Sequence, residues 1–162
     1  MKENQTAREK SLHPEPIATK TREKNNGVET EKNDELDARI VTALQAASDK
    51  KALDIVILDL RGVASFTDYF LITSGMNARQ VQAITDEIVA RLKKQGTRAQ
   101  RVEGYRTAEW VLVDYGDFIV QVFENKARQF YDLERLWRDA ARIAIPVEIA
   151  VDAEGVIIPE AS

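Results

Sequence analysis

The sequence predicts an α/β domain in which helices flank a mixed β-sheet. Runs rich in β-branched residues alternate with segments of helical periodicity, in the order α-β-β-α-β-β-β-α. Several consecutive strands are too close in sequence for the crossover that a parallel pair needs, which predicts a mixed sheet. Apolar residues make up 44% of the 162 residues, enough for one domain with its own core.

Residues 1–32 are predicted to be a disordered tail. They are rich in Lys, Glu, Thr and Asn, and they contain too few large apolar residues to offset the entropy of ordering. His13, the only histidine of the chain, lies in this tail. We interpret it as a solvated residue rather than a ligand or a base.

The first helix is expected to begin after Asn33 or Asp34, either of which could serve as N-cap, and to end near Ala52. Two predicted strands follow, Asp54–Leu60 and Tyr69–Thr73.

Residues 74–77 (SGMN) are predicted to form a turn into a second helix, which ends at Gly96. Ser74-Gly75 ahead of a helix could present N–H groups to a phosphate. We favour an ordinary strand-to-helix turn, because no GxGxxG or P-loop motif accompanies the pair. Ala99–Val102 is the next short strand candidate.

The central feature is a predicted hairpin of Glu109–Val113 and Phe118–Phe123. With Tyr115-Gly116 as a two-residue loop, Asp114 faces Asp117, Val113 faces Phe118 and Trp110 faces Gln121. One face would then carry Val111, Val113, Phe118, Val120 and Val122, and the other Trp110, Leu112, Ile119 and Gln121. Apolar residues on both faces predict a hairpin that is covered at least partly on both sides.

Two chemical interpretations of the hairpin stay open. Asp114 and Asp117 would repel each other unless they are solvated, face a basic partner, or bind Mg²⁺ as a nucleotidyltransferase does. We favour the first two, because the aspartates flank a turn instead of alternating on one strand face. Trp110 is either a core residue or an interface anchor.

A helical segment with Phe130, Leu133, Leu136 and Trp137 on its apolar side is expected to follow the hairpin. Arg128, Arg135, Arg138 and Arg142 are expected on its solvated side. Val147–Val151 and Val156–Ile158 form a predicted hairpin within a C-terminal extension, residues 143–162.

Composition narrows the function classes. Residues 36–162 hold 16 Lys and Arg against 19 Asp and Glu. A charge of −3 suits a basic protein partner better than nucleic acid. The chain has no cysteine, no apolar run of 18 residues and no signal-peptide pattern, from which we expect a cytoplasmic protein outside the membrane.

Several motifs between Asp54 and Trp137 resemble the Iojap family of ribosomal silencing factors: LDLRG, SFTDYFLITSG, RQVQAI, RVEG, AEWVLVDYGDFIVQVF and FYDLERLW. The resemblance implies a nucleotidyltransferase-like fold without catalytic residues or cofactors, spanning residues 33–142. It also implies a non-enzymatic repressor that binds the large ribosomal subunit through the fourteenth large-subunit ribosomal protein. Such a factor blocks joining of the small subunit when nutrients are scarce.

Matched by motif, the family's partner-binding surface falls on Trp110, Asp114, Tyr115, Asp117, Tyr131, Leu133 and Glu134. The chain departs from the family at Gln121, where histidine is common. The resemblance is also compatible with a homodimer. The alternatives are a Mg²⁺-dependent nucleotidyltransferase-like enzyme and an assembly factor for the large subunit.

Overall fold

The computed structural model describes residues 36–146 and 149. Its elements are α4 (Ala38–Asp49), β1 (Leu53–Asp59), β2 (Tyr69–Gly75), α5 (Ala78–Lys94), β3 (Arg101–Glu103), β4 (Trp110–Asp114), β5 (Phe118–Glu124), α6 (Asn125–Tyr131), α7 (Leu133–Leu136) and β6 (Ala141–Ile143). No helix in this part of the chain is long and apolar enough to cross a membrane.

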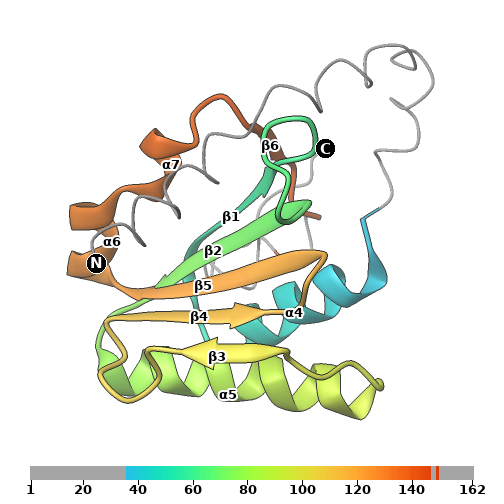
Figure 1. Ribbon diagram of the computed structural model, residues 1–162. Helices are drawn as coiled ribbons and strands as arrows, with labels where there is room; N and C mark the ends of the chain where they lie inside the picture. The colour runs from blue at the N-terminus through green and yellow to red at the C-terminus, as the bar shows by residue number, and fades with distance from the viewer. Residues whose placement is uncertain (1–35, 147–148, 150–162) are drawn as a thin grey trace, which may run out of the picture.

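The six strands form one sheet in the order β3-β4-β5-β2-β1-β6 (Figure 1). The β2–β5 pair is parallel, and the other four pairs are antiparallel. This confirms the predicted mixed sheet. The parallel pair lies at the centre of the sheet. Its two strands can run parallel because α5, β3 and β4 form the long connection between them.

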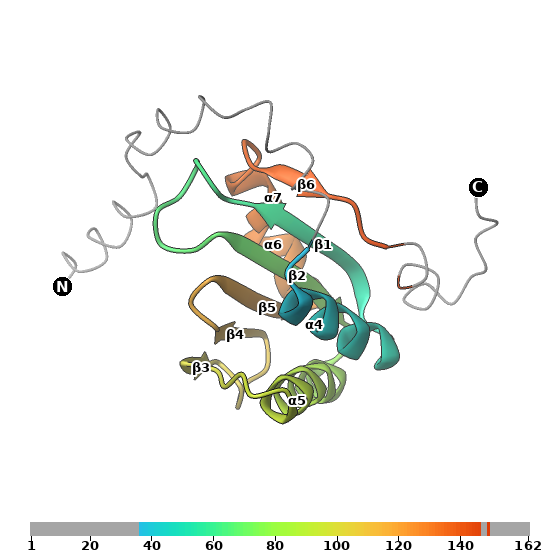
Figure 2. The same ribbon diagram turned by 90° about the vertical axis from the view of Figure 1, so that its right-hand side faces the viewer.

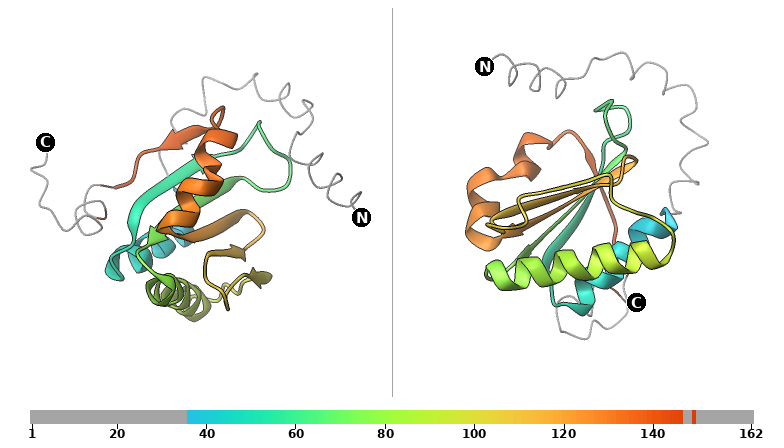
Figure 3. Two further views of the ribbon diagram at one scale, coloured as in Figure 1. Left: turned by 90° about the vertical axis from the view of Figure 1, so that its left-hand side faces the viewer. Right: turned by 60° about the horizontal axis from the view of Figure 1, so that its bottom comes forward.

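Helices cover both faces of the sheet, which we call the α4–α5 face and the α6–α7 face. Figure 2 shows α4 and α5 side by side, and Figure 3 shows α6 and α7 on the other side of the sheet. The core under the first face includes Leu44, Ile84, Ile88, Val111, Val113, Phe118 and Val120. The core under the second includes Phe70, Ile72, Ile119, Phe123, Leu133 and Trp137.

The helix ends follow local capping chemistry. The N-cap of α4 is Asp37, whose carboxylate accepts the Arg39 N–H at 2.8 Å. The prediction of Asn33 or Asp34 was therefore wrong, and Leu36 lies before the helix as a partly buried residue. At the end of α5, Gly96 takes a φ of +91° and donates to the Lys93 carbonyl, as the predicted glycine terminus requires.

The predicted hairpin exists, but its register differs by two residues. Asp114 pairs with Ile119 and Trp110 pairs with Phe123. The Asp114 carboxylate accepts the Gly116 N–H at 2.8 Å, which extends the loop beyond two residues. Because side chains alternate with a period of two, this slip leaves every residue on its predicted face.

The segment after β5 contains one strand that the sequence did not predict. Ala141–Ile143 forms the edge strand β6, antiparallel to β1. The single predicted helix after β5 is two short helices, α6 and α7, joined at Asp132, whose φ is +47°. The predicted tail, residues 1–32, lies outside the described residues, as does the predicted strand Val156–Ile158. Of the other predicted strand, Val147–Val151, the structure describes Ile149, which is helical and not extended as predicted.

Candidate partner-binding surface

Strand β4 contributes to both faces of the sheet, and its two sets of side chains differ in burial. Val111 and Val113 are fully buried under the α4–α5 face. Trp110, Leu112 and Asp114 alternate with them on the α6–α7 face and are only half-buried. The short helices α6 and α7 therefore leave this row of β4 partly open.

Trp110 is neither a buried core residue nor a free surface residue. Its indole stacks on Phe123 with ring centroids 5.1 Å apart and contacts the Tyr131 ring at 4.6 Å. The indole N–H donates to the Gln121 side-chain oxygen at 2.7 Å. Gln121 thus fixes the tryptophan with its amide oxygen.

Aromatic surface continues from Trp110 onto α6. Tyr131 is 45% exposed, and its ring meets that of Phe130 edge to face at 5.0 Å. Phe130 is 79% exposed, and Leu136 of α7 is exposed nearby on the same shallow groove. Their exposure was missed in the sequence, where both residues fit the apolar side of one helix that the structure divides into two.

The backbone around Trp110 depends on one glycine. Gly104, in the loop between β3 and β4, has a φ of +80°. A Cβ atom there would lie 2.1 Å from the Trp110 carbonyl oxygen. Only glycine permits this close approach, so Gly104 helps to set where β4 begins.

The two aspartates of the hairpin do not face each other, contrary to prediction. Asp114 accepts from Arg101 of β3 at 3.3 Å, in addition to the Gly116 N–H. Asp117 accepts from Arg39 of α4 at 2.9 Å. Each carboxylate therefore has a separate cation from its own chain.

Two of the predicted site residues lie beneath the surface. Tyr115 is buried on the α4–α5 face, where its ring stacks on Phe118 with centroids 5.0 Å apart. Its hydroxyl has no hydrogen-bond partner among the described residues, and burial raises its pKa to about 12. Leu133 is buried on the α6–α7 face and supports the surface from within, whereas Tyr115 lies on the opposite face of the sheet.

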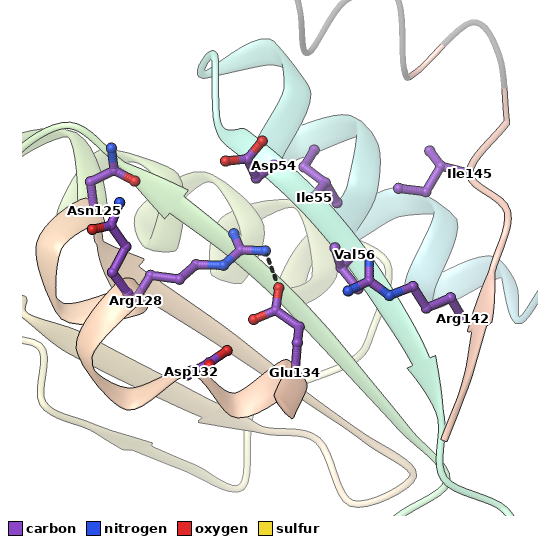
Figure 4. Close-up of a pocket in the computed structure, with 10 residues that line it drawn as sticks. Asp54, Ile55, Val56, Asn125, Arg128, Asp132, Glu134, Arg142 and Ile145 are labelled. Carbon is purple, nitrogen blue, oxygen red and sulfur yellow. Dashed lines mark hydrogen bonds and ion pairs between the residues drawn. The ribbon is translucent and has the colours of Figure 1, made fainter. Parts of the chain in front are cut away.

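Glu134 points into a pocket behind α6, and Figure 4 shows it paired with Arg128. The Arg128 guanidinium donates to Glu134 at 2.6 Å and to the Ser74 hydroxyl at 2.8 Å. Burial alone would raise the pKa of Glu134, but Arg128, with help from Arg142, holds that pKa below its ordinary value. The expectation that Arg128 is solvated was wrong, because its side chain is only 11% exposed.

The pocket, of about 550 Å³, lies between the α6–α7 segment and strands β1 and β6. Its walls carry charges of both signs, from Arg128, Arg142, Asp54, Asp132 and Glu134. Within residues 36–146 and 149, no three His, Cys, Asp or Glu side chains are grouped to hold a metal ion. Ser74-Gly75 lies inside β2 with the serine buried, so this pair does not form the predicted turn.

Comparison with known proteins adds a family to this geometry. A family model described as "Ribosomal silencing factor during starvation" matches residues 33–158. The chain belongs to the ribosomal silencing factor family. The resemblance of its motifs to the Iojap family is also confirmed. A chloroplastic Iojap protein of Zea mays is 31% identical over 108 residues, which cover 67% of this chain and 47% of the maize protein.

Two bacterial silencing factors are more similar. The protein of Halalkalibacterium halodurans is 43% identical, over 71% of this chain and 92% of its own length. That of Bacillus subtilis is 46% identical over 60% of this chain and 83% of its own. A crystal structure from Chromobacterium violaceum superposes with a TM-score of 0.62 at 32% identity, covering 68% of this chain and 92% of that one.

Proposed function

We propose that this silencing factor binds the large ribosomal subunit through its fourteenth ribosomal protein and represses translation. In this proposal the bound factor occupies surface that the small subunit needs for joining. The action is steric and involves no turnover. The close bacterial relatives favour a cytoplasmic site of action over an organelle.

One observation carries this proposal: the half-buried Trp110 and the exposed Tyr131 form an aromatic surface beside β4. Tryptophan and tyrosine are enriched among residues that dominate binding energy, since each buries a large rigid area and offers one polar group. Leu112 adds apolar area on the same strand. Asp117, in the turn that follows β4, supplies an exposed carboxylate that suits a basic ribosomal protein.

The roles of the seven predicted residues divide accordingly. Trp110 and Tyr131 would form the contact itself, with Asp117 at its edge. Asp114 and Tyr115 would hold the turn, while Leu133 and Glu134 would maintain the shape of the surface from within.

Co-sedimentation with isolated ribosomal subunits tests the proposal. We expect the protein to pellet with large subunits and to reduce the yield of joined ribosomes when small subunits are added. Trp110→Ala should weaken pelleting about thirtyfold, as expected for a central aromatic anchor. Tyr105→Ala is the matched control, because it removes an aromatic side chain whose hydroxyl donates to Asp86 of α5. This variant should bind large subunits as the wild type does. Equal binding by both variants would contradict the proposed surface.

A second candidate function is large-subunit assembly. It is favoured by a mouse relative named "Mitochondrial assembly of ribosomal large subunit protein 1", which is 30% identical over 91 residues. Immature large subunits accumulating in a deletion strain would support this candidate. The open aromatic surface would also serve a homodimer, which light scattering at several protein concentrations would detect.

A further inference from the structure

We propose that Arg39 is a positioning residue of the partner-binding surface. In the unbound protein Arg39 holds the Asp117 carboxylate, and on binding it releases this carboxylate to a cation of the partner. This inference rests on the proposed function and adds a specific exchange of ion pairs to it. In chain order Arg39 and Asp117 are 78 residues apart, and they meet because the first turn of α4 lies beside the turn between β4 and β5.

The geometry at Arg39 favours such an exchange. Its Nη2 atom bonds Asp117 at 2.9 Å and Asp37 at 2.7 Å, while its Nε atom makes a second bond to Asp37 at 3.1 Å. The guanidinium also lies 5.2 Å from the centre of the Phe118 ring. When Asp117 leaves, Arg39 keeps the two-point pair with Asp37 and the aromatic contact, so no cation is left unpaired.

Asp117 is better suited to exchange than Asp114. The Asp117 side chain is 67% exposed, against 19% for Asp114. Asp114 also accepts the Gly116 N–H within the turn, so moving its carboxylate would disturb the backbone. The Asp117 backbone is fixed separately, since its carbonyl accepts the Asp68 N–H at 2.9 Å. Its side chain can therefore turn to a partner while the loop stays in place.

Arg39 would thus compete with the partner's cation for one carboxylate. An exposed ion pair shifts an equilibrium by about two- to fivefold, and this shift falls as salt rises. Removing Arg39 should therefore tighten binding of a basic partner by about that factor at low ionic strength. The gain must vanish when Asp117 is neutral, because Arg39 acts on binding only through that carboxylate.

The test measures the dissociation constant of the full chain for large ribosomal subunits at two ionic strengths. We expect Arg39→Gln to bind about two- to fivefold more tightly than the wild type at low salt, with a smaller gain at physiological salt. Arg91→Gln is the matched control. It removes the same charge from an arginine that also bridges two carboxylates, those of Asp49 and Glu87, each at 2.7 Å.

Two further variants separate this role from a general effect of charge or folding. Asp117→Asn should bind more weakly, and adding Arg39→Gln to it should change nothing further. Arg39→Lys keeps the charge but cannot span both aspartates with a planar fork. It should therefore bind more tightly than the wild type, but by less than Arg39→Gln does. Urea unfolding identifies variants that are not folded; Arg39→Lys then replaces Arg39→Gln in the comparison.

The outcomes are distinct. Equal affinities of Arg39→Gln and Arg91→Gln, or weaker binding by Arg39→Gln, would overturn the role of Arg39. The same holds for a gain that persists in the Asp117→Asn background. Failure of the wild type to bind large subunits would instead refute the proposed function on which this inference rests.

Discussion

The two faces of the sheet are built from the same strands but are closed to different degrees. On the α4–α5 face, long amphipathic helices cover the strands, and Val111 and Val113 of β4 have no exposed surface. On the α6–α7 face, helices of seven and four residues leave Trp110 and Leu112 half-buried. The comparison shows that the first face is closed by its helices, whereas the second retains exposed apolar area, which is the surface proposed above to bind a partner.

The largest expected effect tests whether the two faces differ in stability. Ile88→Ala removes a fully buried side chain of α5 and should lower the free energy of unfolding by about 3 kcal/mol. Leu112→Ala removes a half-buried side chain from the open row of β4 and should cost about 1 kcal/mol. Urea denaturation of both variants measures the difference. Equal losses would show that the α6–α7 face is as tightly packed as the other.

A smaller loss is expected from the ion pair that holds the α6–α7 segment. Arg128→Ala removes the ion-pair partner of Glu134, which is only 18% exposed, and the donor to the Ser74 hydroxyl. We expect a loss of about 2 kcal/mol at pH 7 by urea unfolding. Arg135→Ala, on exposed α7, is the control and should change the free energy of unfolding by less than about 0.5 kcal/mol.

The pH dependence of unfolding provides a second test of the Arg128–Glu134 ion pair. The pKa of Glu134 lies below its ordinary value of 4.5 in the folded protein. The carboxylate therefore contributes stability above pH 4.5, and this contribution is lost as the pH falls through the folded pKa. The gap between wild type and Arg128→Ala should narrow between pH 5 and pH 3. A gap independent of pH would mean that Arg128 acts through packing alone.

The smallest expected effect on stability concerns the Tyr115 hydroxyl, a polar group buried on the α4–α5 face. The Tyr115 hydroxyl is buried and has no partner in the described part of the chain. Tyr115→Phe removes this hydroxyl and keeps the ring stacked on Phe118, so stability should stay within about 0.5 kcal/mol of wild type or rise slightly. A thermal melt measures this change. A clear loss would indicate that the hydroxyl is hydrogen-bonded in solution.

Several features of the fold could be predicted because they depend on neighbours along the chain. The period of two along β4 and β5 assigned Val111 and Trp110 to opposite faces, and the structure agrees. Gly96 was found at the end of α5 because glycine tolerates a positive φ. The motifs within residues 54–137 identified the family, which the match over residues 33–158 confirms.

The candidate site was only partly predictable. The sequence placed Trp110 on the same face as Gln121, but it gave neither the half-burial of Trp110 nor its contact with Tyr131. Arg128 was assigned to a solvated side, because helical periodicity does not register the kink at Asp132 that brings Glu134 toward it. Strand β6 was missed because three residues at a sheet edge produce no recognisable period.

Sequence alone thus determined the order of the elements from α4 to β5, the two faces of the hairpin and the family. The hairpin register depends on a local turn, in which the Gly116 N–H donates to Asp114, and only the tertiary structure decided which cation each carboxylate meets. The physical reason is distance along the chain: helical and strand periods arise between residues a few positions apart, whereas Arg39 and Asp117, or Ser74 and Arg128, are brought together by packing. The charges that control the proposed binding surface belong to this second group.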